Sequence, residues 1–457
     1  MKKSTKILCL LLSLALCLSL FAGCSSENEE PSAEPTASTE PSASEEVAAP
    51  VVAPEDAPLM GMEYGNNAAT ALGCYSVPTA APKDANMSAV VAVDGNHNPV
   101  LTNAQLQFFF WEEFYRMQQE YGQYMSMMGL DMSKSLSQQA SLMENYTWEQ
   151  YFIESAKNTF VNFHALASAA QSEGFELPAE DRETLDYYTT AGGGFEAEVI
   201  EGGYESLEAY LHAFYGSGVD MEDYRAYMEK YMLAMAYYND VLYTPAADAL
   251  TEEDISAYYD EHVEELESQG HRKLNNVSVR HILIQPEGEA DAETGEFSEE
   301  QWAAAEAEAK RIYDLWKKNP TEDYFAELAN EHSADGGSNT TGGLYEDFKP
   351  GQMVEEFNDW SFDQSREYGD TEIVQTTYGY HIMFFLKQTD TRVWFDTVMG
   401  TMASDSANAA LEALKEVYPA NFDFTQVRIF DLVVANAQAQ AEAQPEEEHV
   451  HEEGDEH

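Results

Sequence analysis

Two apolar segments far apart in the sequence each predict a β-strand that carries one histidine. The first is V-S-V-R-H-I-L-I (Val277–Ile284), and the second is T-T-Y-G-Y-H-I-M-F-F-L (Thr376–Leu386). Alternation with period two puts His281 and His381 on strand faces that also carry apolar side chains. We therefore expect both imidazole rings to face an apolar interior.

The residues between the two strands predict helices and a glycine-rich loop. Ser298 and Gln301 have the spacing of a capping box, and an apolar stripe of helical period follows them until Asn319-Pro320. A shorter helix is expected at residues 323–335, and residues 336–357 contain the loop and a compact third helix. The stripe consists of Trp302, Ala305, Ala309, Ile312 and Trp316.

The order of these motifs resembles the parvulin family of peptidyl-prolyl isomerases. A strand, the helices, G-Q-M-V-x-E-F and Y-G-Y-H-I follow one another within residues 271–391. The resemblance implies an α+β domain of the FKBP-like superfold that catalyses cis/trans isomerisation of X–Pro bonds.

The resemblance also implies a set of site residues. His281 and His381 match the two family histidines, Asp335 matches the position of a Cys or Asp, and Tyr378 stands where the family often has a hydroxyl residue. The alternative is that both histidines are satisfied core residues. The apolar seat for the proline ring corresponds to Leu344, Met353 and Phe357.

The sequence departs from the family pattern in two places. Residues 342–348 read G-G-L-Y-E-D-F where the family reads G-G-D-L-G-x-F, so the seat around Leu344 differs in shape. The loop after Ile284 reads Q-P-E-G-E-A-D-A-E-T-G-E-F, and its negative charge would repel a phosphate. The altered stretch at residues 342–348 leaves two functions open: an active isomerase, or a weak or inactive domain that serves as a peptide-binding holdase chaperone.

The N-terminal residues predict export from the cytoplasm. Three lysines precede an apolar run at residues 7–21, which is too short for a comfortable membrane span. The following F-A-G-C-S-S resembles the lipobox of bacterial lipoproteins. It implies removal of residues 1–23, lipidation of Cys24 and anchoring on the extracytoplasmic face of a bacterial membrane. The alternative is a secretory signal with a chance cysteine.

Residues 24–86 predict a disordered acidic linker. The stretch from Ser25 to Pro82 is rich in Ser, Glu, Pro and Ala and contains no Lys or Arg, so it offers too little apolar surface to offset its ordering entropy. Apart from Cys24 and the two cysteines of the signal, only Cys74 remains, so we expect no intrachain disulfide in the mature chain.

Residues 87–270 predict a mainly helical domain. Asp94-Gly95 indicates a hairpin turn, Thr102 is the expected N-cap, and an apolar face runs from Leu106 to Met128. This hairpin, the helices and the parvulin-like module resemble the PrsA/SurA class of extracytoplasmic foldases, whose helical part holds unfolded polypeptide. The alternative is that the Met and Tyr stripes only fill a core. Further helices are expected at residues 148–172, 178–190, 206–215, 221–242 and 251–266.

The C-terminal segment, residues 392–434, predicts an amphipathic helix at 394–418 and a strand at 422–434. In the resembled class this segment packs on the N-terminal helical part, which makes one discontinuous domain with the parvulin module inserted. The tail, residues 435–457, ends H-V-H-E-E-G-D-E-H. We expect it to be disordered, and a weak transition-metal site is the alternative.

The charge balance restricts the partners. With 83 acidic and 23 basic residues the formal charge is -60, which argues against nucleic-acid binding. The sequence contains no P-loop, dinucleotide fingerprint or tetrahedral Cys/His set, so we expect no cofactor and no metal. The expected partners are unfolded or newly secreted polypeptides and, through Cys24, the lipid bilayer. The sequence leaves the oligomeric state open.

Overall fold

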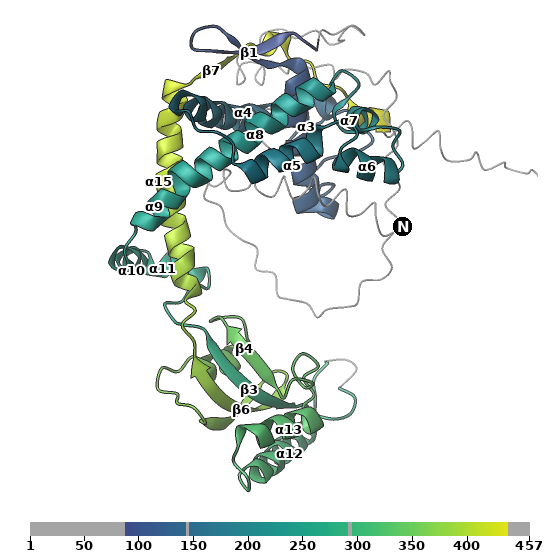
Figure 1. Cartoon of the computed structure of the whole chain (residues 1–457). Helices are drawn as coiled ribbons and strands as arrows, with labels where there is room; N and C mark the ends of the chain where they lie inside the picture. The colour runs from purple at the N-terminus through teal and green to yellow at the C-terminus, as the bar shows by residue number, and fades with distance from the viewer. Residues whose placement is uncertain (1–86, 143–145, 291–294, 437–457) are drawn as a thin grey trace, which may run out of the picture. The chain divides into compact units, whose positions relative to one another are not determined.

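The computed structural model describes residues 87–142, 146–290 and 295–436, which form two compact units (Figure 1). The helical unit runs up to Thr244 and resumes at Ser406, and the sheet unit is Pro245–Asp405. The expected fold class, α+β with an α+β domain inserted into a helical one, is therefore confirmed. The signal, Cys24, Cys74, the whole linker (residues 24–86) and nearly all of the tail lie outside the described residues.

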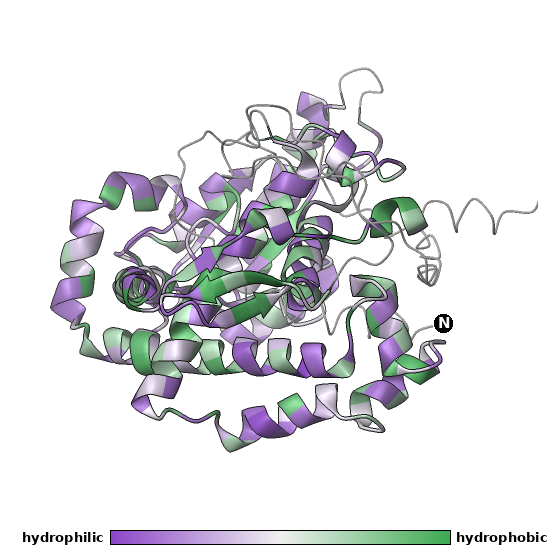
Figure 2. Ribbon diagram, turned by 90° about the horizontal axis from the view of Figure 1, so that it is seen from above, coloured by the Kyte–Doolittle hydropathy of each residue, from purple (hydrophilic) through white to green (hydrophobic). Residues whose placement is uncertain are grey.

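The helical unit is organised around long amphipathic helices. The N-terminal ends of α3 (Asn103–Tyr121) and α4 (Trp148–Glu173) carry capping boxes, from Thr102 with Gln105 and from Thr147 with Gln150. Hydrophobic and hydrophilic segments alternate along the helices drawn in Figure 2, as expected for helices with one buried face. Further helices of this unit are α5 (Ala179–Thr189), α6 (Gly194–Glu201), α7 (Leu207–Tyr215) and α8 (Met221–Tyr237).

A small antiparallel sheet joins the two ends of the helical unit. Its strands are β1 (Val90–Asp94), β2 (Pro99–Thr102) and β7 (Ala420–Phe422), in the order β2-β1-β7. Asn103 Nδ2 donates to the Gln426 carbonyl at 2.7 Å, and Gln107 Nε2 donates to the Arg428 carbonyl at 2.7 Å. The C-terminal segment therefore packs on the N-terminal part of this unit.

Several predicted limits in the helical unit are wrong. The apolar face expected to reach Met128 leaves the helix early, because α3 ends at Tyr121 and a 3₁₀ turn (Gly122–Tyr124) follows. Residues 422–434 do not form one strand, since β7 ends at Phe422 and a 3₁₀ turn (Phe424–Gln426) and a helical turn at 432–436 follow. Beyond α8 the chain forms a π-helical turn (Tyr238–Tyr243) and then α9 (Thr244–Ala249).

The sheet unit contains a four-stranded antiparallel sheet in the order β4-β3-β6-β5. The helices α12 (Glu299–Trp316) and α13 (Glu322–His332) cover the face that carries Ile282, Ile382 and Phe384. The other face carries Val279, Met383 and Phe385 and packs with α14 (Glu355–Ser361). The strands are β3 (Val277–Ile284), β4 (Leu344–Phe348), β5 (Thr371–Thr376) and β6 (Gly379–Gln388).

A third, smaller core in the sheet unit lies outside this sheet. It joins α10 (Glu252–Glu261) and α11 (Val263–Ser268) to the first turns of α15 (Val393–Val417). The sequence predicted a single helix at residues 251–266, and the structure shows instead that this helix is interrupted at His262. Across the described ranges, every helix is too short or too polar to cross a bilayer. The buried residues of this core are Ile255, Tyr259, Leu266, Trp394 and Val398.

Candidate functional site

The pairing of β3 with β6 brings the two predicted histidines together. In this register His281 lies opposite Met383, and Leu283 lies opposite His381, so the two imidazoles are diagonal neighbours on one face of the sheet. Their Nδ1 atoms are 3.0 Å apart and their ring centroids 5.2 Å apart. Both rings are buried, with 2 % and 5 % of their surface exposed.

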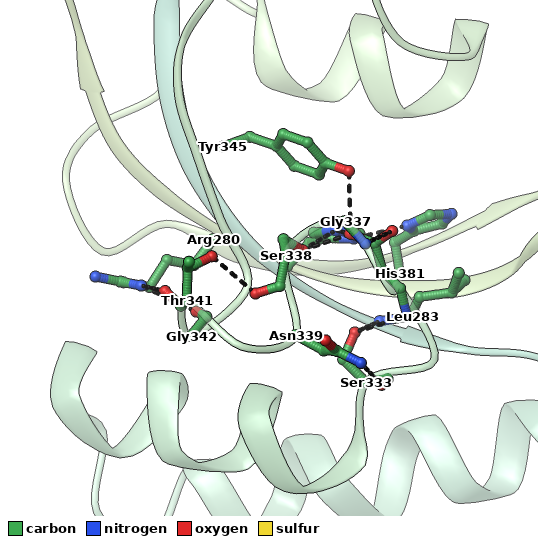
Figure 3. Close-up of polar contacts among 12 residues, drawn as sticks. Arg280, Leu283, Ser333, Gly337, Ser338, Asn339, Thr341, Gly342, Tyr345 and His381 are labelled. Atoms are coloured by element: carbon green, nitrogen blue, oxygen red, sulfur yellow. Dashed lines mark hydrogen bonds and ion pairs between the residues drawn. The ribbon is translucent and has the colours of Figure 1, made fainter. Parts of the chain in front are cut away.

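Asp335 completes the cluster from the loop after α13. Its Oδ2 atom lies 2.9 Å from His281 Nε2 and accepts hydrogen bonds from the hydroxyls of Ser338 and Tyr345, the latter at 3.0 Å. Figure 3 shows the Tyr345 hydroxyl directed toward this cluster. The hydrogen bond from His281, helped by that from Ser338, holds the pKa of Asp335 well below its usual range. Asp335 is therefore a carboxylate at any working pH.

His381 has a second partner on its far side. Its Nε2 lies 2.9 Å from the hydroxyl of Thr376, which also accepts the Tyr378 backbone N–H at 3.1 Å. Burial, with a smaller contribution from the neighbouring His281, lowers the pKa of His381 to about 3. The His381 ring is therefore neutral near pH 7.

These contacts define the direction of the hydrogen bonds. A carboxylate only accepts, so Nε2 of His281 carries the proton that faces Asp335. In a neutral His281 ring Nδ1 is then an acceptor, and Nδ1 of His381 donates to it. Nε2 of His381 accepts in turn from the Thr376 hydroxyl. With His281 neutral, the donors of this chain all point toward Asp335.

Phe357 of α14 forms an apolar wall against both imidazoles. Its ring stands at 84° to each of them, with centroids 5.2 Å from His281 and 5.3 Å from His381. Phe357 is buried, and Met353 packs half-buried in the same apolar cluster. Two of the three residues predicted for the proline seat thus lie on the histidine face of the sheet.

Leu344 does not lie on the histidine face of the sheet, and Tyr345 occupies that face instead. Leu344 pairs with Arg280, whereas Tyr345 pairs with Val279. Since directly paired residues share a face, Tyr345 lies on the histidine side and Leu344 on the opposite side. The sequence carried this signal: when G-G-D-L-G-x-F is aligned with residues 342–348, the family leucine falls on Tyr345.

Tyr378 does not join the cluster through its hydroxyl. It lies in the turn between β5 and β6 with 56 % of its surface exposed, and among the described residues no hydrogen bond involves its hydroxyl. The hydroxyl that reaches His381 belongs to Thr376, two residues earlier. Sequence reasoning missed Thr376, Ser338 and Tyr345.

Gly343 allows the loop before β4 to lie directly on β3. Its carbonyl accepts the His281 backbone N–H at 2.8 Å, and its φ is +70°. A Cβ at this position would lie 2.1 Å from the His281 carbonyl oxygen, so only glycine fits. Arg280 holds the same loop by donating to the Thr341 and Gly342 carbonyls, both at 3.0 Å (Figure 3).

The polar groups of the site are occupied by one another. Within the ranges that the structure describes, no group of three or more His, Cys, Asp or Glu side chains has the arrangement of a metal site. The arrangement can instead orient two imidazole rings, hold one carboxylate at a fixed position and offer an apolar wall beside it.

Comparison with known proteins identifies relatives of this module. Residues 281–387 match the family described as Rotamase, PPIC-type PPIase domain. The foldase protein PrsA 1 of Listeria innocua serovar 6a is 31 % identical over 140 residues, which is 31 % of this chain and 37 % of that protein. The foldase protein PrsA of Caldanaerobacter subterraneus subsp. tengcongensis is 31 % identical over 206 residues, which is 45 % of this chain and 54 % of that protein.

A solved peptidylprolyl isomerase, PrsA from Bacillus cereus, aligns with 68 % of this chain and 100 % of its own, with 17 % identity and a TM-score of 0.25. The matched part of this chain thus spans between about a third and about a half of the length of the two curated relatives.

Proposed function

We propose that this chain, whose residues 281–387 are a parvulin-type peptidyl-prolyl isomerase domain of the PrsA class, catalyses cis/trans isomerisation of X–Pro bonds in unfolded polypeptides outside the cytoplasm. The observation that carries the proposal is the chain Thr376–His381–His281–Asp335, set beside the wall of Phe357. Its chemistry needs no nucleophile, metal or cofactor.

The barrier to be lowered comes from amide resonance. Rotation about a peptide bond has a barrier of about 18–20 kcal/mol, because the planar state places negative charge on oxygen and positive charge on nitrogen. The twisted transition state has lost this charge separation. Any group that destabilises the separated charges relative to the twisted state accelerates the reaction, about tenfold for each 1.4 kcal/mol.

Asp335 is the group proposed to act on the charge. A carboxylate next to the substrate carbonyl oxygen raises the energy of the planar, charge-separated form more than that of the twisted form. Its remaining 19 % exposure leaves it accessible from solvent, while three side-chain donors keep it ionised and fixed. The histidines are positioning residues in this scheme, since they orient Asp335.

The proline ring is proposed to sit against Tyr345, Met353 and Phe357. These side chains supply apolar surface on the same face as the imidazoles. Burial of the ring there also removes water from the carbonyl group of the X–Pro bond. This favours the less polar twisted state.

The proposal is tested by refolding of a protein whose slow phase is limited by proline isomerisation. Catalytic amounts of this protein should accelerate that phase, and His381→Ala should abolish most of the acceleration while a distant control, His164→Ala in the helical unit, retains it. An unaccelerated slow phase with wild-type protein contradicts the proposal.

A second candidate is a holdase that binds peptide without turnover. The observation that favours it is the tyrosine at position 345, where the family has leucine. A holdase would suppress aggregation of a denatured client and leave its proline-limited phase unchanged. Measuring both readouts on the same client separates the two functions.

The anchoring of the protein is also a proposal, supported by the lipobox-like F-A-G-C-S-S at residues 21–26. In a bacterial host, wild-type protein should incorporate labelled fatty acid and sediment with membranes. Cys24→Ser should do neither. Recovery of wild-type protein in the soluble fraction without label contradicts anchoring.

A further inference from the structure

The helical unit contains a cavity that is separate from the histidine site. It has a volume of about 210 Å³ and lies between β2, the start of α3 and α8. The volume is below the range of about 300–1,000 Å³ that is usual for drug-sized ligands, so the cavity suits a small group. Its apolar walls come from Pro99, Val100, Leu101, Phe109, Ala226 and Tyr227, and its polar residues are Thr102, Gln105 and Lys230.

Lys230 is the cation of this cavity, and it lacks an acidic partner. Its Nζ donates to the Val100 carbonyl at 3.1 Å and lies 4.7 Å from the centroid of the Phe160 ring. Among the described residues no carboxylate lies within 4.0 Å of it. The other half-buried lysines, by contrast, all form ion pairs: Lys157 with Glu154, Lys273 with Asp260 and Lys415 with Glu412.

The absence of a carboxylate is unusual because the chain has 83 acidic and 23 basic residues. Burial lowers the pKa of Lys230 to about 8, so most molecules carry the charge at pH 7. A half-buried cation without a counter-ion is unfavourable, and an anion in the cavity would offset this.

A structural role accounts for only part of this arrangement. β2 is an edge strand, and a lysine bound to an outward carbonyl protects such an edge from pairing with other strands. That role uses one of the three protons of the ammonium group and does not require a cavity. Gln105 adds a further donor: its amide oxygen accepts from the Thr102 backbone, which leaves its NH₂ group for a ligand.

We propose that this cavity binds a carboxylate carried by a short apolar group, with Lys230 as the charged contact and Gln105 as a second donor. The aromatic and aliphatic walls would hold the apolar part. The last residue of a polypeptide and a free short-chain carboxylate share this chemistry. The site lies in the helical unit and is independent of the proposed isomerase activity.

The test is calorimetric titration of the full chain with acetylated tetrapeptides ending in leucine, either as the free acid or as the amide. A charge-assisted hydrogen bond predicts at least about tenfold tighter binding of the acid. Lys230→Met should abolish the difference between acid and amide, and Lys157→Met should retain it. Equal binding of acid and amide to wild-type protein, or an acid preference that survives in Lys230→Met, overturns the proposal.

A titration with 4-methylpentanoate distinguishes the two ligand sources. If it competes with the peptide acid at equal concentration, the cavity takes free carboxylates, and if only the peptide binds, it takes chain ends. Both results support the site, whereas binding of 4-methylpentanoate that is unaffected by Lys230→Met counts against it.

A measurement on wild-type protein keeps the proposal testable if Lys230→Met does not fold. The acid preference should fall as the pH rises from 7 to 9, because Lys230 loses its proton. The titratable neighbours of Lys230 keep the same charge between pH 7 and pH 9. Burial raises the pKa of Tyr227 well above its usual value and lowers that of His164 to about 4, so both stay neutral over this range. A preference that is constant over this range contradicts the role of Lys230.

Discussion

The Nδ1 atoms of His281 and His381 lie 3.0 Å apart on neighbouring strands, and one proton joins them. Because each ring has a different second partner, Asp335 for His281 and Thr376 for His381, the tautomer of each ring depends on the other. Substitutions along this chain should therefore affect the whole cluster.

Acid should destabilise the sheet unit through His381. Its pKa is about 3 in the folded protein and about 6.5 in the unfolded chain, so the unfolded state binds more protons between these values. The stability contributed by the neutral ring is complete above pH 6.5 and decreases as the pH falls toward 3. By pH 5 the loss amounts to about 2 kcal/mol.

Hydrogen exchange of β6 amides at pH 7.5 and pH 5, corrected for intrinsic rates, measures this loss in the sheet unit. In His381→Asn the difference in β6 hydrogen exchange between pH 7.5 and pH 5 should become smaller. His164→Asn is the matched control, since His164 also has a lowered pKa but lies in the helical unit. If the pH dependence of β6 hydrogen exchange is unchanged in His381→Asn, another group is responsible for the loss of stability in acid.

Asp335→Asn should lower kcat/KM for a proline peptide by at least about tenfold with little change in KM, because the negative charge acts mainly on the barrier. Asp347→Asn provides the control: the Asp347 carboxylate accepts from Thr389 and Thr391 in the same unit, and none of the hydrogen bonds of the described residues joins it to His281 or His381. Full activity in Asp335→Asn would exclude an electrostatic role for this carboxylate.

Tyr345→Phe should lower kcat/KM by about three- to tenfold and the free energy of unfolding by about 1 kcal/mol, the usual worth of one hydrogen bond. The variant keeps the ring beside His281 and loses one of the three side-chain donors to Asp335. Tyr345→Leu should behave similarly if the hydroxyl is what matters. A severe loss in the leucine variant alone would assign the role to the ring.

Thr376→Val should destabilise the sheet unit by about 1–3 kcal/mol, because it leaves the buried Nε2 of His381 without a donor. Thr376→Ser keeps the hydroxyl and should cost clearly less in a urea unfolding measurement. Equal losses in both variants would point to the methyl group instead of the hydrogen bond.

The sequence predicted those elements in which local pattern and tertiary packing agree. The strand Val277–Ile284 and the helix capped by Ser298 are found as predicted, because period-two and helical periodicity coincide with faces that the fold buries. The helix of residues 106–128 was predicted too long, since an apolar stripe does not show where packing ends. Tyr121 and Tyr124 continue the stripe and are exposed.

The candidate site was only partly accessible to sequence reasoning. His281, Asp335, His381 and Phe357 belong to motifs, and the structure brings them together. Tyr345 replaced Leu344 because strand register, which a single-residue shift inverts, decides which side chain faces the histidines. Thr376 and Ser338 are small polar residues without a distinctive pattern, so only the fold reveals that their hydroxyls meet the cluster.

The most direct test of the proposed activity is the cis/trans exchange rate of an uncharged proline tetrapeptide, measured by two-dimensional exchange NMR with and without this protein. Exchange should be faster with wild-type protein, most of that acceleration should be lost in Asp335→Asn, and Asp347→Asn should remain active. Exchange at the uncatalysed rate with folded wild-type protein would contradict the proposed activity.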